Sequence, residues 1–384
     1  MADEITSALR PQLLGRMTQR AVVEALRGNG PMSRADISRF TGISPTTVSS
    51  AITQVLRGGL VEETDAEISG PGRPGKILRL ASELSQVVGV SVEPDWCHMV
   101  AGSLAGQLHA DRQTHFPTPN TYARLLAEIE RVAQPWLTLP GTRTLGIGLS
   151  LPGLIDPTGE RAVFSPNLHQ TDDQRPGRDL SDRLGVPTVL IQETDALCLA
   201  ERRAHRTDDL AVVDYTGGLG VGRLVGGRLL NRHFGLPSEL GHLTVVPNGE
   251  LCGCGNYGCL ETVATDAAFA RLVSARAGHT MTPEEALAAP FDVTPERDRV
   301  LDYLAIAVAA TTNLYAPPLI VLHGRLLHSA PGLMEALVER ASGRKLFPFR
   351  DRCRLVTSTT TKAGGAVAGA IEFVFESLGP MLAG

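Results

Sequence analysis

The stretch 239–261 constrains the fold of this chain more than any other. Three cysteines, Cys252, Cys254 and Cys259, fall within eight residues, and His242 lies just upstream. Thiolates and imidazole are the ligands that Zn²⁺ prefers, and one Cys₃His set completes a closed, four-coordinate structural site. The alternative is a group of buried thiols without a metal, but packing gives no reason for such a cluster. We therefore expect structural Zn²⁺.

Two carboxylates, Glu239 and Glu261, flank this cluster. Ionised carboxylates only accept hydrogen bonds, which suits them to the hydroxyl groups of a sugar. A rigid metal site beside them would fix their orientation toward a ligand. The alternative is that both acids are solvated surface groups. We expect them to bind a sugar.

The first eighty residues predict three helices and two strands. Apolar spacing indicates a helix over 13–27, and glycine-containing turns separate it from helices over 34–40 and 45–56. A helix, a glycine turn and a second helix form a helix-turn-helix. The third helix begins with short polar side chains that can approach bases and phosphates: Ser44, Thr46, Thr47, Ser49 and Ser50.

Two strands, over 59–63 and 77–80, enclose a stiff basic tip that contains Arg73. An arginine at the tip of such a wing can enter a minor groove. Between residues 10 and 60 there are seven arginines against only Glu24 and Asp36. That local excess favours DNA binding although the whole chain carries a net charge of −5. The alternative is a small helical interaction domain.

The pattern Glu-x-Gly-His-x₉-Cys-x-Cys-Gly-x₂-Gly-Cys-x-Glu resembles the signature of the ROK family of repressors, open reading frames and sugar kinases. The resemblance implies that His242 and the three cysteines bind zinc, and that Glu239, His242 and Glu261 contact a sugar. It also implies an N-terminal winged helix-turn-helix followed by a two-lobed, actin-like ATPase (ribonuclease H-like) sugar-kinase fold of the α/β class. Ser165-Pro166-Asn167-Leu168 resembles a family motif, which makes Asn167 a further sugar ligand.

Glu193 matches the position of the general base in kinases of the family, where an Asp is usual. It is one methylene longer, so it can still accept a hydroxyl hydrogen bond while its reach for base catalysis changes. The alternative is that Glu193 only caps the following helix, which we expect over 197–205.

The phosphate-binding turns of the kinases are altered in this chain. The first turn resembles Asp-x-Gly-Gly-Thr-Lys in the family, but here it reads Ser91-Val92-Glu93-Pro94-Asp95-Trp96. A proline has no N–H to offer a phosphate. In the second turn Gly217 replaces a threonine, and in a third place His323 and Arg325 replace small residues. We therefore expect no phosphoryl transfer, the alternative being an ATP-dependent hexose kinase.

Composition limits the remaining possibilities. The six cysteines are too few and too clustered for a secreted disulfide scaffold, and we find no apolar signal segment or membrane span. We expect a cytoplasmic protein with no membrane partner. The predicted domains are a winged helix over 1–82 and a sugar-sensing domain over 83–384, with lobe I over about 83–195 plus 363–384 and lobe II over about 196–362.

Together these features predict a sugar-responsive transcriptional repressor of carbohydrate uptake or metabolism genes. Its expected partners are operator DNA, a small-molecule sugar effector and further copies of itself in a homodimer or homotetramer, because paired winged helices read two-fold operators. A zinc-containing scaffold that does not bind DNA is a third possibility.

Overall fold

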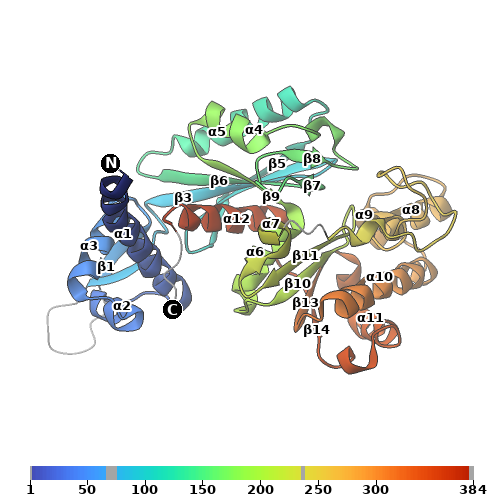
Figure 1. Cartoon of the computed structure of the whole chain (residues 1–384). Coiled ribbons are helices and arrows are strands. Elements are labelled where there is room, and N and C mark those ends of the chain that lie inside the picture. The colour runs from blue at the N-terminus through green and yellow to red at the C-terminus, as the bar shows by residue number, and fades with distance from the viewer. Residues whose placement is uncertain (1, 66–75, 235–237, 380–384) are drawn as a thin grey trace. The chain divides into compact units, whose positions relative to one another are not determined.

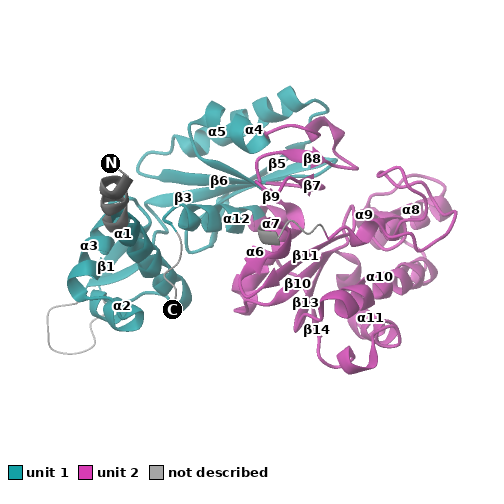
Figure 2. Ribbon diagram, viewed as in Figure 1, with its two compact units in different colours: residues 1–149, 176–190, 366–384 teal, residues 150–175, 191–365 magenta. Residues whose placement is uncertain are grey.

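The computed structural model describes residues 2–65, 76–234 and 238–379 (Figure 1). The chain divides into two compact units (Figure 2). The first contains residues 1–149, 176–190 and 366–384, and the second contains residues 150–175 and 191–365. Each unit is built around a five-stranded sheet.

The first unit begins with three helices and a hairpin. Their bounds are α1 (Ala2–Asn29), α2 (Arg34–Thr41), α3 (Pro45–Arg57), β1 (Val61–Asp65) and β2 (Lys76–Leu80). The two strands pair antiparallel, and α1 packs against both α2 and α3. This arrangement is the winged helix-turn-helix that the sequence predicts, whereas the wing tip with Arg73 falls outside the described residues.

Local capping signals explain where α2 and α3 begin and end. The Ser33 hydroxyl accepts from the Asp36 N–H in a capping box at the start of α2. Gly42 then ends α2 in the left-handed conformation with φ of 69°, which glycine adopts without a steric penalty. Ser44 caps α3 and Pro45 is its first residue, where the missing N–H costs nothing.

The inward face of α3 is apolar. Val48, Ile52 and Val55 are fully buried. The first strand of the hairpin begins two residues later than predicted, because Gly59 turns the chain with φ of 72°. Burial of these side chains, at roughly 1.5–3 kcal/mol each, stabilises the recognition helix on its supporting helices.

The rest of the first unit is a sheet with helices on both faces. The sheet order is β5-β4-β3-β6-β9. The bounds are β3 (Ser85–Val92), β4 (Trp96–Gly102), β5 (Leu108–Pro117), α4 (Tyr122–Leu137), β6 (Arg143–Leu151), α5 (Pro176–Leu184), β9 (Thr188–Gln192) and α12 (Lys362–Glu376). The last two residues of β6 and of β9 and the first four residues of α12 fall in the second unit. Figure 1 shows α4 and α5 on one face and α12 on the other. A Cβ at Gly148 would lie 2.0 Å from the Ala366 carbonyl oxygen, so α12 and β6 are in backbone contact.

The second unit repeats this strand order, with the sheet β12-β11-β10-β13-β14. Its strands are β7 (Leu154–Ile155), β8 (Ala162–Phe164), β10 (Leu210–Asp214), β11 (Gly220–Val225), β12 (Arg228–Leu229), β13 (Leu319–His323) and β14 (Arg354–Thr357). Its helices are α6 (Glu193–His205), α7 (Leu230–Phe234), α8 (Asp266–Ala277), α9 (Pro283–Leu287), α10 (Thr294–Tyr315) and α11 (Leu333–Ser342). Short 3₁₀ turns include Leu240–His242 and Leu260–Thr262. The shared order indicates that the two sheets are copies of one pattern.

Glycine and proline separate two helices of the second unit: Gly278 ends α8 with φ of 78°, and Pro283 begins α9. One predicted helix differs in the structure. Helix α6 begins at Glu193 and not at residue 197, because the Gln192 side chain accepts from the Thr194 and Asp195 N–H groups. None of the described helices is long and apolar enough to cross a membrane.

Candidate metal and sugar site

The cysteine-rich loop of the second unit brings four potential metal ligands together. One ligand atom from each of His242, Cys252, Cys254 and Cys259 lies within 4.8 Å of the others. The Cys254 and Cys259 sulfurs are 3.7 Å apart. A disulfide would require about 2.05 Å, whereas Zn–S bonds of about 2.3 Å in a tetrahedron place two sulfurs about 3.8 Å apart. The donor set and spacing fit a metal ion.

The loop reaches this geometry through glycine and backbone hydrogen bonds. Gly258 has φ of 72°, and a Cβ there would lie 1.8 Å from the Val246 carbonyl oxygen. The Gly258 carbonyl accepts from the N–H groups of Val245 and Val246. Any side chain at this position would push the segment around Gly258 away from the segment around Val246, so this position requires glycine.

Each ring nitrogen of His242 has a neighbour that orients the ring. Its Nδ1 lies 3.6 Å from the Cys252 sulfur, and its Nε2 lies 3.8 Å from Glu239 Oε2. A carboxylate beside the second ring nitrogen is the usual outer partner of a metal-bound histidine, and it favours the tautomer that leaves the first nitrogen unprotonated. Glu239 therefore faces the metal cluster while its side chain remains 39% exposed.

Glu261 links the cluster to the glycine-rich turn after β10. Its Oε2 accepts from the Leu219 N–H at 3.0 Å, and its Oε1 lies 3.7 Å from the Cys252 sulfur. The Leu219 N–H therefore holds one oxygen of this acid. This hydrogen bond uses one backbone donor of the turn that resembles the second phosphate turn of the kinases.

Asn167 comes to the same loop from the short β8 region. A Cβ at Gly253 would lie 2.6 Å from Asn167 Oδ1, so the glycine makes room for this amide. The Asn167 side chain is exposed. The structure thus brings four of the predicted sugar ligands to the cysteine-rich loop: Asn167, Glu239, His242 and Glu261.

Glu193 lies in the first turn of α6. The carbonyl of the next residue, Thr194, would be 2.4 Å from a Cβ at Gly222, so α6 packs closely on β11. The residue that caps the helix is Gln192 and not Glu193. Glu193 is instead bonded to Lys362 at 2.9 Å.

Lys362 is a site residue that the sequence reasoning missed. Its Nζ also lies 3.0 Å from Asp214 Oδ2, and its side chain is 8% exposed. The other Asp214 oxygen bonds His323 Nδ1 at 3.1 Å and the Thr216 hydroxyl. Lysine is rare in this chain, with only three among its 36 Lys and Arg residues, and this rarity is the one sequence signal that marks Lys362.

Burial and neighbouring charges shift the pKa values of Asp214 and His323. Burial alone raises the pKa of Asp214, but the Lys362 and His323 charges outweigh burial, so the net pKa lies below the usual value. Burial lowers the pKa of His323, whereas the hydrogen bond and charge of Asp214 raise it more, so its net pKa lies above the usual value. The aspartate is therefore a fixed anion that binds the Lys362 ammonium group and the His323 ring.

The predicted DNA-binding side chains lie on the outer surface of α3. Ser44, Thr46, Thr47 and Ser50 are exposed, and Ser49 is half-buried. The Ser44 hydroxyl also accepts from the Thr47 N–H. Arg73 cannot be placed, because it lies outside the described residues.

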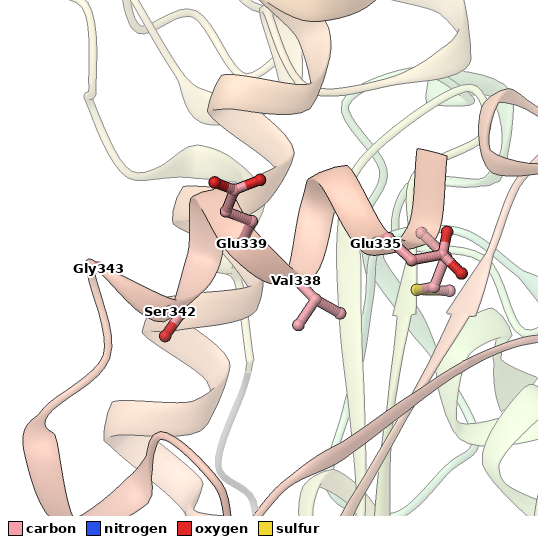
Figure 3. Close-up of a pocket in the computed structure, with 6 residues that line it drawn as sticks. Glu335, Val338, Glu339, Ser342 and Gly343 are labelled. Atoms are coloured by element: carbon pink, nitrogen blue, oxygen red, sulfur yellow. The ribbon is translucent and has the colours of Figure 1, made fainter. Parts of the chain in front are cut away.

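A shallow groove runs along α11 in the second unit (Figure 3). Its lining residues are Met334, Glu335, Val338, Glu339, Ser342 and Gly343. None of them belongs to the metal cluster or to the group around Lys362. The groove is therefore separate from the candidate site.

Two family models match the chain. One described as "ROK family" matches residues 87–376, and one described as "Winged helix-turn-helix DNA-binding" matches residues 18–62. The chain belongs to the ROK family. The prediction of this family, with a winged helix at the front, is thereby confirmed.

Curated members similar to this ROK chain include two regulators. The "Xylose repressor" of Bacillus subtilis is 24% identical over 337 residues, which cover 86% of this chain and 87% of that protein. The "DNA-binding transcriptional dual regulator NagC" of Escherichia coli is 25% identical over 366 residues, which cover 90% of this chain and 89% of that protein.

Solved structures show the same fold. A ROK family transcriptional regulator described as a homologue of the E. coli MLC protein has a TM-score of 0.77, with 24% identity, and the match covers 95% of this chain and 98% of that one. A ROK family glucokinase from Streptomyces griseus has a TM-score of 0.66, with 20% identity, over 74% of this chain and 98% of that one. The predicted winged helix plus actin-like kinase fold is confirmed.

Proposed function

We propose that this ROK chain is a sugar-responsive, DNA-binding transcriptional repressor of genes for carbohydrate uptake or metabolism. The observation that carries the proposal is that one chain has both a recognition-type helix with exposed polar side chains and, beside a His/Cys₃ cluster, carboxylate and amide side chains that suit sugar hydroxyls. The repressor names of the similar proteins support it.

The DNA contacts that we propose come from α3 and the wing. The short polar side chains of α3 would contact bases and phosphates, and the wing arginine would enter the minor groove. These residues are Ser44, Thr46, Thr47, Ser49, Ser50 and Arg73. The Arg73→Gln variant has one cationic group fewer to neutralise a phosphate, so the salt dependence of its operator binding should fall by about one unit of slope.

The effector that we propose is a free hexose-like or pentose-like sugar. Its ligands would be Asn167, Glu193, Glu239, His242 and Glu261, which provide carboxylate, amide and imidazole groups for hydroxyls. Calorimetric titration with D-glucose, N-acetyl-D-glucosamine and D-xylose tests this. Glu261→Gln should weaken the sugar that binds by at least about tenfold, because a charge-assisted hydrogen bond contributes ~1.5–3 kcal/mol. Equal affinity in both proteins would refute the assignment.

We propose that the metal is structural Zn²⁺, held by His242, Cys252, Cys254 and Cys259. These four donors leave no open position for substrate, and zinc would supply a rigid support for Glu239 and Glu261. Metal analysis of the purified protein should give one zinc per chain. Another metal, or no metal in fully folded protein, would contradict this proposal.

We also propose that the chain transfers no phosphoryl group. In the altered second phosphate turn the Leu219 N–H already bonds the Glu261 carboxylate, so a phosphate there would meet negative charge in place of a free donor. At the third altered place, which resembles the adenosine side of the kinases, the Arg325 and Leu326 N–H groups already bond Asp266. The fold shared with the S. griseus glucokinase keeps an ATP-dependent hexose kinase as the alternative. Sugar-dependent release of ADP would establish that alternative.

For the organisation of the chain we propose a winged-helix domain over 1–82 and a sugar-sensing domain over 83–384. We propose that it works in the cytoplasm as a homodimer or homotetramer, because two-fold operators require paired recognition helices. Light scattering of the purified chain measures the oligomer size. A strict monomer that binds operator with full affinity would refute this part.

A further inference from the structure

The ion pair between Lys362 and Glu193 lies at one end of a single helix. Lys362 is the first residue of α12. Its Nζ is 2.9 Å from Glu193 and 3.0 Å from Asp214, and both acids are largely buried. Removing the ammonium group would take an ion-pair partner from each of two largely buried carboxylates, which is costly. The first turn of α12 therefore contributes to the orientation of Glu193.

The other end of α12 contacts the first DNA-binding helix. Arg27 of α1 donates to Glu372 of α12 at 2.7 Å, and its guanidinium lies 5.7 Å from the centre of the Phe375 ring. The Arg27 and Glu372 side chains are only 18% and 11% exposed. Just beyond the helix, Arg20 donates to the Gly379 carbonyl at 2.7 Å. These contacts lie within the first unit.

Helix α12 is one continuous helix, and it packs closely on the sheet of the first unit near Ala366 and Val367. A Cβ at Gly148 of β6 would lie 2.0 Å from the Ala366 carbonyl, and one at Gly102 of β4 would lie 2.8 Å from Val367. Close-packed elements of this kind transmit a shift as a whole and do not absorb it locally. A change at Lys362 therefore reaches the contact with Arg27 through a continuous helix.

We propose that Lys362 is a positioning residue that orients Glu193 for the effector and, through α12, makes the Arg27–Glu372 contact with α1 sensitive to effector binding. A sugar hydroxyl that donates to Glu193 competes with Lys362 for the same carboxylate. The ammonium group then shifts toward Asp214, and α12 shifts with it. This inference rests on the proposed function, because it assumes that a sugar binds at Glu193.

The first test needs no sugar. Operator affinity and thermal stability are measured for the full-length protein, for Lys362→Met with its partner neutralised by Glu193→Gln, and for the control Glu128→Gln, which breaks a surface pair with Arg131. The double variant should change the operator Kd by at least about threefold, whereas the control should not. An unchanged operator Kd in a folded double variant overturns the inference.

The second test uses the sugar response. The change in operator Kd caused by saturating D-glucose, N-acetyl-D-glucosamine or D-xylose is compared with the sugar affinity itself. Glu372→Gln should retain sugar affinity within about twofold, while its sugar response should fall by at least about fivefold. The charge swap Arg27→Glu with Glu372→Arg should restore most of the response. A full response in Glu372→Gln overturns the inference alone, whereas no response to any bound sugar in the unmodified protein overturns the proposed function as well.

Discussion

Replacing Asp195 by asparagine should remove a pH-dependent loss of stability. Asp195 lies in the first turn of α6, is 3% exposed, and its Oδ1 has no hydrogen-bond partner within the part of the chain that is described. Burial raises the pKa of this carboxyl to about 7, and the charge of Arg232 opposes the shift. The folded protein therefore binds this proton more tightly than the unfolded chain does.

The magnitude follows from the two pKa values. The ordinary value is 3.8 and the folded value is about 7. This difference of about three pKa units corresponds to ~4 kcal/mol of unfolding free energy, at ~1.36 kcal/mol per pKa unit. Because the folded pKa is raised, this stabilisation is complete below the unfolded pKa and is lost as pH rises through the folded pKa. Between about pH 5 and about pH 8 the parent should lose ~3 kcal/mol that the asparagine variant keeps.

Urea unfolding across this pH range measures the effect. The difference between the Asp195→Asn and parent unfolding free energies isolates this carboxyl, because Asp266, with a pKa raised to about 6 by burial, titrates in both proteins. Asp182→Asn is the matched control, since that acid is exposed on α5. If parent and Asp195→Asn show the same pH slope, the buried carboxyl is not titrating as described.

Three further changes test the metal loop and the recognition helix. Cys254→Ser should lose the bound metal and the sugar response of operator binding, and a variant that keeps both, by metal analysis and titration, contradicts the zinc account. Gly258→Ala should destabilise the fold by more than ~2 kcal/mol, because its φ is 72° and its Cβ would meet the Val246 carbonyl; urea unfolding measures it, and a neutral change would refute the loop geometry. Ser44→Ala should cost ~1 kcal/mol of stability, because alanine cannot accept from the Thr47 N–H, and unaltered unfolding would show that this cap contributes nothing.

The features that could be predicted from the sequence alone are those that depend on residues close together in the chain. Ser44 and Pro45, two adjacent residues, specify the start of α3. The four potential metal ligands fall in one short stretch that folds on itself. The start of α6 was missed because glutamine is a less usual cap than the residues that normally fill that role. It is the side chain of Gln192, and not a standard signal, that moves the helix start to Glu193.

Lys362 could not be predicted from local pattern because its partners are distant in the chain. It lies 169 residues from Glu193, and sequence spacing gives no indication that the two meet. The Arg27–Glu372 pair joins residues 345 positions apart. Such contacts depend on the tertiary fold within each unit, and no local motif encodes them.

Operator binding by the purified protein tests most directly whether the chain is a sugar-responsive repressor; it is measured at fixed salt, with D-glucose, N-acetyl-D-glucosamine, D-xylose and ATP added in turn. One sugar should change the operator Kd by at least about fivefold, and ATP should have no effect. Consumption of ATP with a sugar, while operator affinity stays unchanged by every sugar, would contradict the repressor function.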